Sequence, residues 1–289
     1  MNKTMKVCVI GGANVDITAT SAAAFRVGDS NPGRVHVSWG GVGRNIAHNL
    51  ALLGDDVELL TIFGGGLFGP VIAAACREIG IRTDRCEIAP EGTNSFFVAL
   101  NNADGELVGG VADMTATEGM TPAWLAERRE VINGADAVVA DANSSAEALA
   151  WLIDHCERPL YLDAVSVAKA GRIKEALALS RRKAFFALKS NALEHQVLAD
   201  LGGAAVQRIY TSLGAEGLQV EAAGGSYRFP ALPCIVRSVT GGGDALLAGI
   251  VHAGPGATVE ESARVGLLCA RCAVESPHAV NEDIRNLQL

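Results

Sequence analysis

The sequence predicts an α/β fold: a three-layer α/β/α sandwich that carries a small β-sheet lid. First, short apolar runs alternate with helical segments from Val57 onward, which is typical of a parallel sheet covered by helices. Second, polar residues directly follow these runs, at the strand ends where parallel sheets bind ligands. Third, residues 17–39 and 94–111 show no helical period and are rich in turn-forming and β-prone residues, so they predict the lid strands.

The composition indicates one globular domain over residues 1–289. The chain is 49% hydrophobic and 19% charged, and neither an internal repeat nor a linker rich in proline, serine or charge divides it. Its formal net charge of −8 argues against binding nucleic acid or a membrane surface. We therefore expect neither nucleic acid nor membrane among its partners.

We expect a cytoplasmic protein. No signal peptide opens the chain, and no apolar run reaches the roughly 18 residues that span a membrane. Its seven cysteines, an odd number without disulfide-like spacing, are typical of a reducing compartment. Cys269 and Cys272 form a CxxC within Val265–Val274, which has a helical pattern. No second Cys or His pair lies near it, so core packing is favoured over a metal site.

Short apolar runs predict the strands of the main sheet. They are Lys6–Ile10, Val57–Phe63, Ala137–Ala140, Leu160–Leu162, Ala184–Leu188 and Arg208–Ser212. The first run is followed by two glycines and then by Asn14 and Asp16, two polar side chains just past its end. A good turn sequence over residues 102–105 predicts a hairpin of Ser95–Leu100 and Glu106–Val111 in the lid.

Apolar periodicity and capping residues predict the helices. They are the segment from Ile46 to Leu53, Pro70–Glu78, Ala146–His155, Lys169–Leu179 and a long last helix that includes Val265–Val274. Gly54 and Gly80 end the first two, because glycine adopts the left-handed backbone found at helix C-termini. Thr258 followed by Glu261 is a capping signal for the last helix.

The stretch from Thr240 to Gly249 carries the clearest chemistry. Gly241, Gly242 and Gly243 run into Asp244, which opens an apolar helical segment. Backbone amides of consecutive glycines at a helix start form an anion cradle suited to phosphate. A carboxylate inside such a cradle fits phosphoryl transfer to an alcohol, where it accepts the hydroxyl proton. The same pattern also fits a flexible glycine loop with a helix-capping Asp, and by itself it leaves both interpretations open.

A second glycine-rich turn, residues 40–45, also enters a helix and raises the alternative of a dinucleotide site. The pattern there is GxGxxI rather than GxGxxG. The preceding Arg34–Trp39 segment is polar and alternating, whereas a buried parallel strand is continuously apolar. His48 on this helix is interpreted as a partly buried structural histidine rather than a catalytic one.

Taken together, these motifs resemble the PfkB/ribokinase family of sugar and nucleoside kinases over nearly the whole chain. The resemblance rests on several motifs in the family's order: Asn14-Val15-Asp16, Gly40-Gly41-Val42-Gly43-Arg44-Asn45, Asn191-Ala192-Leu193-Glu194, Ser212-Leu213-Gly214-Ala215-Glu216-Gly217 and Thr240-Gly241-Gly242-Gly243-Asp244. It implies a ribokinase-like fold and an ATP-dependent kinase that uses Mg²⁺ and acts on a sugar or nucleoside. It also implies a homodimer formed through the lid.

The resemblance assigns roles residue by residue. Asp16 and Asn45 would hold sugar hydroxyls, with Asn14, Gly41, Gly43 and Asn143 as further candidates. Asp244 would be the catalytic base, and the amides of Gly241, Gly242 and Gly243 would bind the transferred phosphate. Asn191 and Glu194 would organise Mg²⁺ through its waters, and Ser212, Gly214 and Gly217 would line the nucleotide groove. From the residues alone, a common helix start is the favoured explanation of Asn191 and Glu194.

The chain departs from the family pattern at three places. Gly64-Gly65-Gly66 stands where Gly-Asp-Asp is common, which leaves room for a weakened enzyme. Val239 replaces a usual Asp, and Ser238 occupies a position associated with a monovalent-cation site, so potassium activation is not expected. The segment Gln196–Gln207 is short and is predicted to lack a helix.

The expected function is phosphorylation of a primary alcohol. Within the family, the segment around Asp29–Gly33 and the helix that follows Gly40 resemble pseudouridine kinases, so the 5′-hydroxyl of pseudouridine is the expected acceptor. Ser30, Asn31, His36 and Ser38 of the lid offer donors and acceptors for a uracil edge. Ribose, fructose and adenosine are alternative acceptors. An NAD(P)-dependent oxidoreductase and a non-catalytic sugar- or nucleotide-binding regulator are the rival functions.

Overall fold

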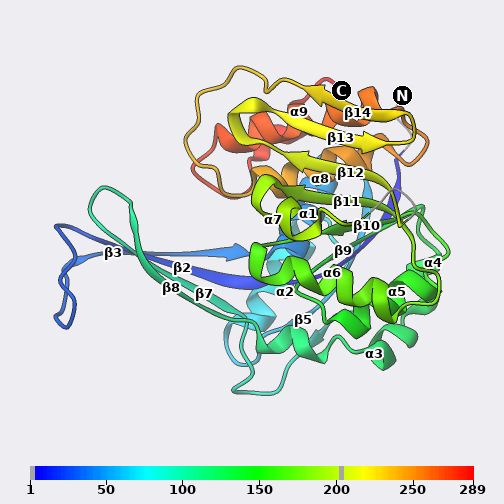
Figure 1. The fold of residues 1–289 in the computed structure, drawn as a ribbon. Helices are drawn as coiled ribbons and strands as arrows, with labels where there is room; N and C mark the ends of the chain where they lie inside the picture. Colours follow the sequence, from blue (N-terminus) through cyan, green and yellow to red (C-terminus); the bar gives the residue numbers. More distant parts are fainter. Residues whose placement is uncertain (1–3, 202–204) are drawn as a thin grey trace.

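A computed structural model describes residues 4–201 and 205–289, and Figure 1 shows its main element, an eight-stranded sheet. The strand order is β14-β13-β12-β11-β10-β9-β1-β4. Strands β4, β1, β9, β10, β11 and β12 run parallel, while β13 and β14 close one edge as antiparallel strands. The strands are β1 (Lys6–Ile10), β4 (Asp56–Leu60), β9 (Ala137–Asp141), β10 (Leu160–Asp163), β11 (Phe185–Asn191), β12 (Val206–Ser212), β13 (Leu218–Ala222) and β14 (Gly225–Phe229).

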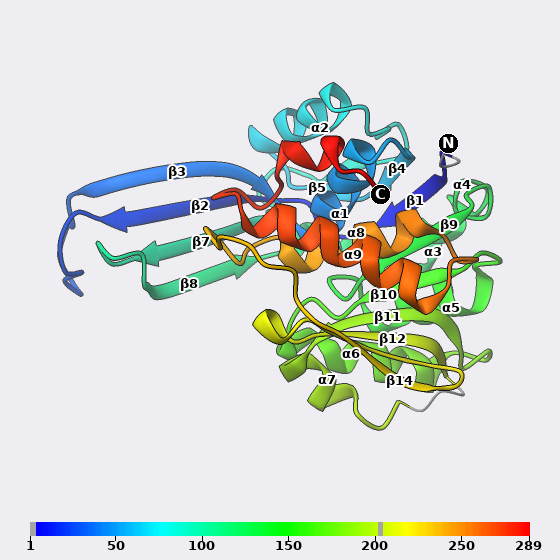
Figure 2. The same ribbon diagram turned by 90° about the horizontal axis from the view of Figure 1, so that it is seen from above.

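Helices cover both faces of this sheet, which confirms the three-layer prediction (Figure 2). One face packs against α1 (Val42–Leu52), α2 (Phe68–Glu78), α8 (Gly242–Ala253) and α9 (Val259–Val274). The other packs against α3 (Pro122–Ala126), α4 (Arg129–Asn133), α5 (Ala146–His155), α6 (Val167–Leu179) and α7 (Ala192–Leu198). Successive strand residues point to opposite faces, so Val9 joins the first core and Ile10 the second.

A second, four-stranded sheet projects from the main body, to the left in Figure 1. Its order is β3-β2-β7-β8, from β2 (Asn14–Ser21), β3 (Gly33–Gly40), β7 (Phe96–Asn101) and β8 (Leu107–Asp113). These strands come from the two stretches predicted to form the lid, and we call this element the small sheet. A short two-stranded sheet of β5 (Ile62–Phe63) and β6 (Glu87–Ile88) completes the strands of the described chain.

Several predicted boundaries were wrong. The run Val57–Phe63 is not one strand, because the ladder with β1 ends at Leu60 and the chain then pairs with β6. Helix α1 begins at Val42, four residues earlier than predicted. Gly41 adopts φ 98° there, and the amide of Arg44 donates to the carbonyl of Gly12. This tertiary contact starts the helix within the glycine turn, so Asn45 lies in its first turns rather than in a loop.

Other expectations hold or fall outside the described residues. Thr258 and Glu261 form the predicted capping box of α9. Cys269 and Cys272 of the same helix are buried in a hydrophobic cluster, as expected for core packing. Helix α7 ends at Leu198, but residues 202–204 lie outside the described part, so the expected shortness of this connection is not tested throughout. In the described part of the chain, no helix is both long and apolar enough to cross a membrane.

Candidate active site

A row of charged side chains crosses the carboxyl edge of the parallel sheet. Asp141 of β9 pairs in register with Asp163 of β10, and Asp163 pairs in register with Lys189 of β11. Their exposed fractions are 0%, 1% and 7%. Burying charged groups is costly unless they are paired or hydrogen-bonded, so this row is a candidate functional site. Asp141 and Asp163 directly follow the predicted strands Ala137–Ala140 and Leu160–Leu162, so they are among the polar residues expected at strand ends, but the sequence assigned Lys189 no role.

Asp244 lies beside this row at the start of α8. It is 9% exposed, and its Oδ2 accepts a 2.9 Å hydrogen bond from Nδ2 of Asn45 on α1. Burial, together with the negative charge of Asp163, raises the pKa of Asp244 to about 7, against the lowering influence of Lys189 and Asn45. A carboxyl group with a pKa near neutrality is suited to accept a proton.

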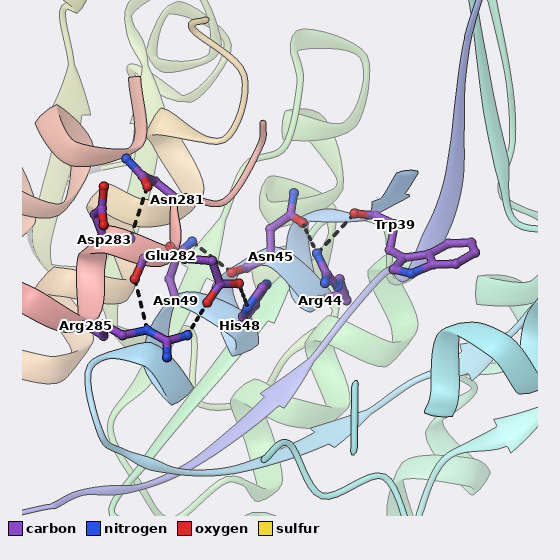
Figure 3. Close-up of polar contacts among 9 residues, drawn as sticks. All are labelled: Trp39, Arg44, Asn45, His48, Asn49, Asn281, Glu282, Asp283 and Arg285. Atoms are coloured by element: carbon purple, nitrogen blue, oxygen red, sulfur yellow. Dashed lines mark hydrogen bonds and ion pairs between the residues drawn. The ribbon is translucent and has the colours of Figure 1, made fainter. Parts of the chain in front are cut away.

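The orientation of the Asn45 amide is set by its neighbour Arg44 (Figure 3). Nη1 of Arg44 donates to Oδ1 of Asn45 at 3.2 Å and to the carbonyl of Trp39 at 3.1 Å. Because the side-chain oxygen Oδ1 of Asn45 accepts from the Arg44 guanidinium, the side-chain NH₂ group of Asn45 is directed to Asp244. Arg44 is therefore a positioning residue that the sequence analysis missed, since only the fold brings Trp39 and Asn45 to its two sides.

One turn further along α1, His48 lies against the C-terminal 3₁₀ segment Glu282–Asn286 (Figure 3). Its Nε2 is 3.2 Å from Oε1 of Glu282, whose carboxylate also contacts Arg285. Burial and the nearby Arg44 charge lower the pKa of His48 to about 4, so the ring is neutral at pH 7. This agrees with a structural rather than a catalytic histidine.

The glycines before Asp244 allow a close approach of two segments. Gly241 is the N-cap of α8 with φ 80°, and a Cβ at this position would overlap the carbonyl of Ala279. The first amides of a helix have no intrahelical acceptor, and the hydrogen bond from the amide of Gly242 to the carbonyl of Val239 is long at 3.4 Å. The start of α8 therefore presents amide N–H groups next to Asp244, as an anion cradle requires.

Asn14 and Asp16 lie on β2, where the small sheet leaves the main body. Nδ2 of Asn14 donates to Oδ1 of Asp16, and burial raises the pKa of Asp16. Asp16 extends from the face of the small sheet that also carries Ser38. Its carboxylate lies beside Gly40, where a Cβ would overlap it. Asp16, a predicted sugar ligand, and Asn14, a further candidate, are thus brought together.

Gly41 and Gly43 support the site through the backbone. A Cβ on Gly41 would overlap the carbonyl of Gly12, and one on Gly43 would lie 2.8 Å from the backbone of Gly11. The amides of Gly12 and Gly43 each donate to Oδ2 of Asp141 at 2.9 Å. The amide of Gly43 is consequently engaged in holding two loops together.

Asn143 follows β9 and borders a cavity of about 640 Å³. Its side-chain Oδ1 accepts a 2.5 Å hydrogen bond from Nζ of Lys169, and its backbone N–H donates to Oδ1 of Asp141. The cavity is also lined by Met114, Ser145 and Lys169, so it is bounded by residues from the end of the small sheet and from both adjoining helices. Asn143 therefore contacts the buried Asp141 on one side and lines this cavity on the other.

Asn191 and Glu194 form a complete capping box at the start of α7. Oδ1 of Asn191 accepts the amides of Leu193 and Glu194, each at 2.9 Å. The Glu194 carboxylate accepts the backbone amide and the side-chain amide of Asn191, at 2.8 and 2.7 Å. Glu194 is 3% exposed, and burial raises its pKa, whereas the charge of Lys189 lowers it. Each carboxylate oxygen keeps a further lone pair, while the Asn191 oxygen is fully engaged.

The predicted nucleotide segment lies beside this box. Ser212 pairs in register with Asn191, and its Oγ donates to the carbonyl of Ser190 at 3.3 Å. Gly214 and Gly217 adopt φ 60° and 98° in the turn from β12 to β13, and a side chain on Gly217 would overlap the backbone of Phe229. The left-handed backbone of this turn, next to the capping box, therefore favours glycine at both positions.

Packing explains two glycines of the triplet that departs from the family pattern, Gly64 and Gly65, whereas Gly66 has open space around it and adopts φ 73°. A Cβ on Gly65 would overlap the carbonyl of Pro90, and one on Gly64 would lie 2.9 Å from the amide of Ser95. The amide of Gly65 donates to the carbonyl of Thr93 at 2.7 Å. The loop therefore packs backbone to backbone against residues 90–95, where larger side chains do not fit.

The sequence matches the pfkB family carbohydrate kinase pattern over residues 4–285. It is 33% identical to the pseudouridine kinase of Escherichia coli, over 96% of this chain and 93% of that protein. A carbohydrate kinase structure from Agrobacterium tumefaciens is 30% identical, with a TM-score of 0.83 and coverage of 98% of this chain and 96% of the other.

More distant structures share the fold. The Arabidopsis thaliana ribokinase complexed with ribose and ATP has a TM-score of 0.82 at 18% identity, with 98% of each chain covered. The rival dinucleotide interpretation is wrong, because the strand before the glycine turn, β3, is an antiparallel strand of the small sheet. The chain therefore belongs to the PfkB family of carbohydrate kinases, phosphotransferases that act on a hydroxyl group of a sugar or nucleoside.

Proposed function

We propose that this kinase transfers the γ-phosphoryl group of ATP to the 5′-hydroxyl of a nucleoside, with pseudouridine as the preferred acceptor. The observation that carries the reaction chemistry is the buried Asp244 directly at the glycine-rich start of α8, hydrogen-bonded to Asn45. Asp16 and Asn45 bind ribose hydroxyls, with Asn14 orienting Asp16 through their hydrogen bond. These groups orient the acceptor so that its primary hydroxyl reaches Asp244.

In the proposed step, Asp244 accepts the hydroxyl proton while the acceptor oxygen forms a bond to phosphorus. The bond between that phosphorus and the bridging oxygen of ATP breaks, and ADP leaves. The amides of Gly241, Gly242 and Gly243 stabilise the negative charge on the transferring group. With a pKa near 7, Asp244 is partly ionised at neutral pH, and the ionised fraction can accept the hydroxyl proton.

Mg²⁺ is proposed as the metal, held through its waters by Glu194. The carboxylate fits this role because each oxygen retains a lone pair after accepting from Asn191. Magnesium keeps several waters and needs few protein ligands, which suits a site without a ready-made cage. In the described chain no group of three or more His, Cys, Asp and Glu side chains is arranged to hold a metal. Asn191 then positions Glu194, and Ser212, Gly214 and Gly217 border the nucleotide groove.

Two observations support a nucleoside acceptor. The first is the identity of 33% to a pseudouridine kinase over nearly the full length of both chains. The second is the cavity of about 640 Å³ bordered by Asn143, a further candidate sugar ligand, which offers room for a base. His36 and Ser38 lie on the same face of the small sheet as Asp16, so they are placed to contact a nucleoside whose ribose is bound by Asp16. Asn31 is less suited, since its side chain bonds to Arg26 and Asp29 within its own turn.

The substrate is tested by comparing kcat/KM for pseudouridine, uridine, adenosine, ribose and fructose with ATP and Mg²⁺. A site that hydrogen-bonds the extra ring N–H of pseudouridine leaves a partner unpaired with uridine, so pseudouridine is expected to lead uridine by about tenfold or more. Higher kcat/KM on ribose, fructose or adenosine would overturn the substrate and leave the kinase assignment standing. Nucleotide binding without turnover on any acceptor would favour the regulator.

A homodimer through the small sheet is also proposed. Strand register places Val35, Val37, Leu100 and Val111 on the face opposite Asp16, and their exposed fractions are 69%, 43%, 36% and 70%. An open sheet with an uncovered apolar face gains stability by packing against a second copy. Val37→Lys with Val111→Lys should halve the mass in sedimentation velocity. Val27→Lys is the control, because Val27 is 90% exposed but lies in the turn between β2 and β3.

A further inference from the structure

Lys189 is a buried cation that lies against the start of α8. It is 7% exposed, and a Cβ on Gly243 would lie 2.5 Å from its Nζ and 3.2 Å from its Cε. The N-terminal end of a helix carries positive partial charge, so it is an unfavourable neighbour for an ammonium group. Two positive features therefore lie side by side in the interior, and this arrangement favours the binding of an anion between them.

Asp163 compensates the ammonium only in part. Its Oδ2 lies 3.1 Å from Nζ of Lys189. Within residues 4–201 and 205–289 this is the one ion pair of Lys189. Its geometry is too poor to count as a hydrogen bond, so Oδ2 of Asp163 has no hydrogen-bond partner among these residues. An ammonium carries three donors, so N–H groups of Lys189 remain available for an incoming anion.

Three carboxylates act electrostatically on Lys189: those of Asp163, Asp244 and Glu194. These three groups also define its place. The ammonium is thus near both Asp244, proposed as the base, and Glu194, proposed to organise the metal, and a phosphoryl group in transfer would pass between these two groups.

We propose that Lys189 is a further catalytic residue whose ammonium binds a non-bridging oxygen of the transferring phosphoryl group, with Asp163 as its positioning residue. The inference rests on the proposed function, which puts this group at the amides of Gly241–Gly243. As the acceptor oxygen bonds to phosphorus and the bond to ADP breaks, the acceptor proton goes to Asp244. Lys189 keeps its protons throughout and offsets charge on the phosphoryl oxygens.

The test uses a charge-balanced variant, because Lys189→Met alone leaves Asp163 buried and unpaired. In Lys189→Met with Asp163→Asn, affinities for ADP and for a non-hydrolysable ATP analogue are measured by calorimetry with Mg²⁺. A contact to the γ-phosphoryl group predicts that the analogue loses about tenfold to a hundredfold in affinity, while ADP changes by less than about threefold. Equal losses for the two nucleotides, or no loss for the analogue, would overturn the inference.

Lys174→Met is the matched control. Lys174 is a partly exposed lysine of α6 that pairs with Asp200 at 2.7 Å, outside the site. It should leave both affinities and turnover unchanged, whereas the double variant should lose about 10²-fold in kcat with little change in the acceptor KM. The nucleotide comparison needs no acceptor. A wild-type enzyme that turns over no acceptor would therefore defeat the proposed function, and the ATP-to-ADP affinity ratio would still decide the role of Lys189.

Discussion

Asn45 donates a 2.9 Å hydrogen bond to the Asp244 carboxylate although 199 positions separate the two residues in the chain. The bond joins the first turns of α1 and α8. Arg44 donates a hydrogen bond to Oδ1 of Asn45, and this bond fixes the orientation of the Asn45 side-chain amide. A donor aimed at a carboxylate stabilises its ionised form, so Asn45 opposes the rise in the pKa of Asp244 that burial causes.

The first prediction concerns this hydrogen bond. Asn45→Ala should raise the pKa of Asp244 above 7 and move the acid limb of the kcat/KM profile up by about half a pH unit to one unit, because a hydrogen bond to a charged group is lost. The KM for the acceptor should also rise. Asn49→Ala, one turn along α1 and without contact to Asp244, should leave the limb in place. An unchanged limb in Asn45→Ala would contradict the coupling.

The second prediction concerns the base itself. Wild-type kcat/KM should fall as the pH drops below about 7, since Asp244 must be ionised to accept the proton. Asp244→Asn keeps the shape but cannot accept a proton, so kcat should fall about 10²- to 10⁴-fold with the fold intact by circular dichroism. Near-normal turnover in this variant would show that another group takes the proton.

The third prediction is that the same substitution stabilises the protein at alkaline pH. The pKa of Asp244 is raised in the folded state from 3.8 to about 7, so its contribution to folding is present below pH 4 and is lost as the pH rises to 7. Asp244→Asn does not titrate. Its free energy of unfolding should exceed that of the wild type by about 2–4 kcal/mol above pH 7 and by progressively less toward pH 4. A difference that is independent of pH in urea titrations would argue against the raised pKa.

Part of the candidate site could be expected from the sequence because motif order and strand ends are local features. Asp244 was singled out from the glycines before it, and Asn191 with Glu194 from the resemblance to the family. The sheet order brings these segments to one edge, which follows from parallel strands joined by helices. The three-layer fold and the small sheet were predictable for the same reason: apolar runs and turns alternate in a regular order.

The features that sequence reasoning missed depend on contacts between distant segments. Lys189 is unremarkable at a strand end until Gly243 and Asp163 are found on its two sides. The early start of α1 depends on Gly12, which accepts the amide of Arg44. The Gly65 loop likewise has a reason only once Pro90 packs against it. No periodicity or spacing encodes these approaches, because each involves segments brought together by folding.

The last prediction separates two roles of Glu194. As a capping residue it stabilises the start of α7, and as a metal-organising residue it would act on the waters around Mg²⁺. Glu194→Gln retains the capping geometry, since glutamine also serves at this helix position, but it removes the negative charge. We expect the Mg²⁺ concentration for half-maximal activity to rise about tenfold, because a charged partner of the hydrated ion is lost. Acceptor binding without nucleotide should be nearly unchanged.

The chain contains its own control for this test. Glu261 forms the equivalent capping box with Thr258 at the start of α9, where Thr258 N donates to Oε2 of Glu261 at 2.8 Å. Both carboxylates cap a helix, but only Glu194 is buried beside Lys189 and Asp163, whose charges affect its pKa. Glu261→Gln should therefore keep its helix cap with a small effect on the free energy of unfolding and leave the magnesium dependence unaltered. If the two variants show the same magnesium dependence, Glu194 acts only as a helix cap, and the metal must be organised by other groups at this edge of the sheet.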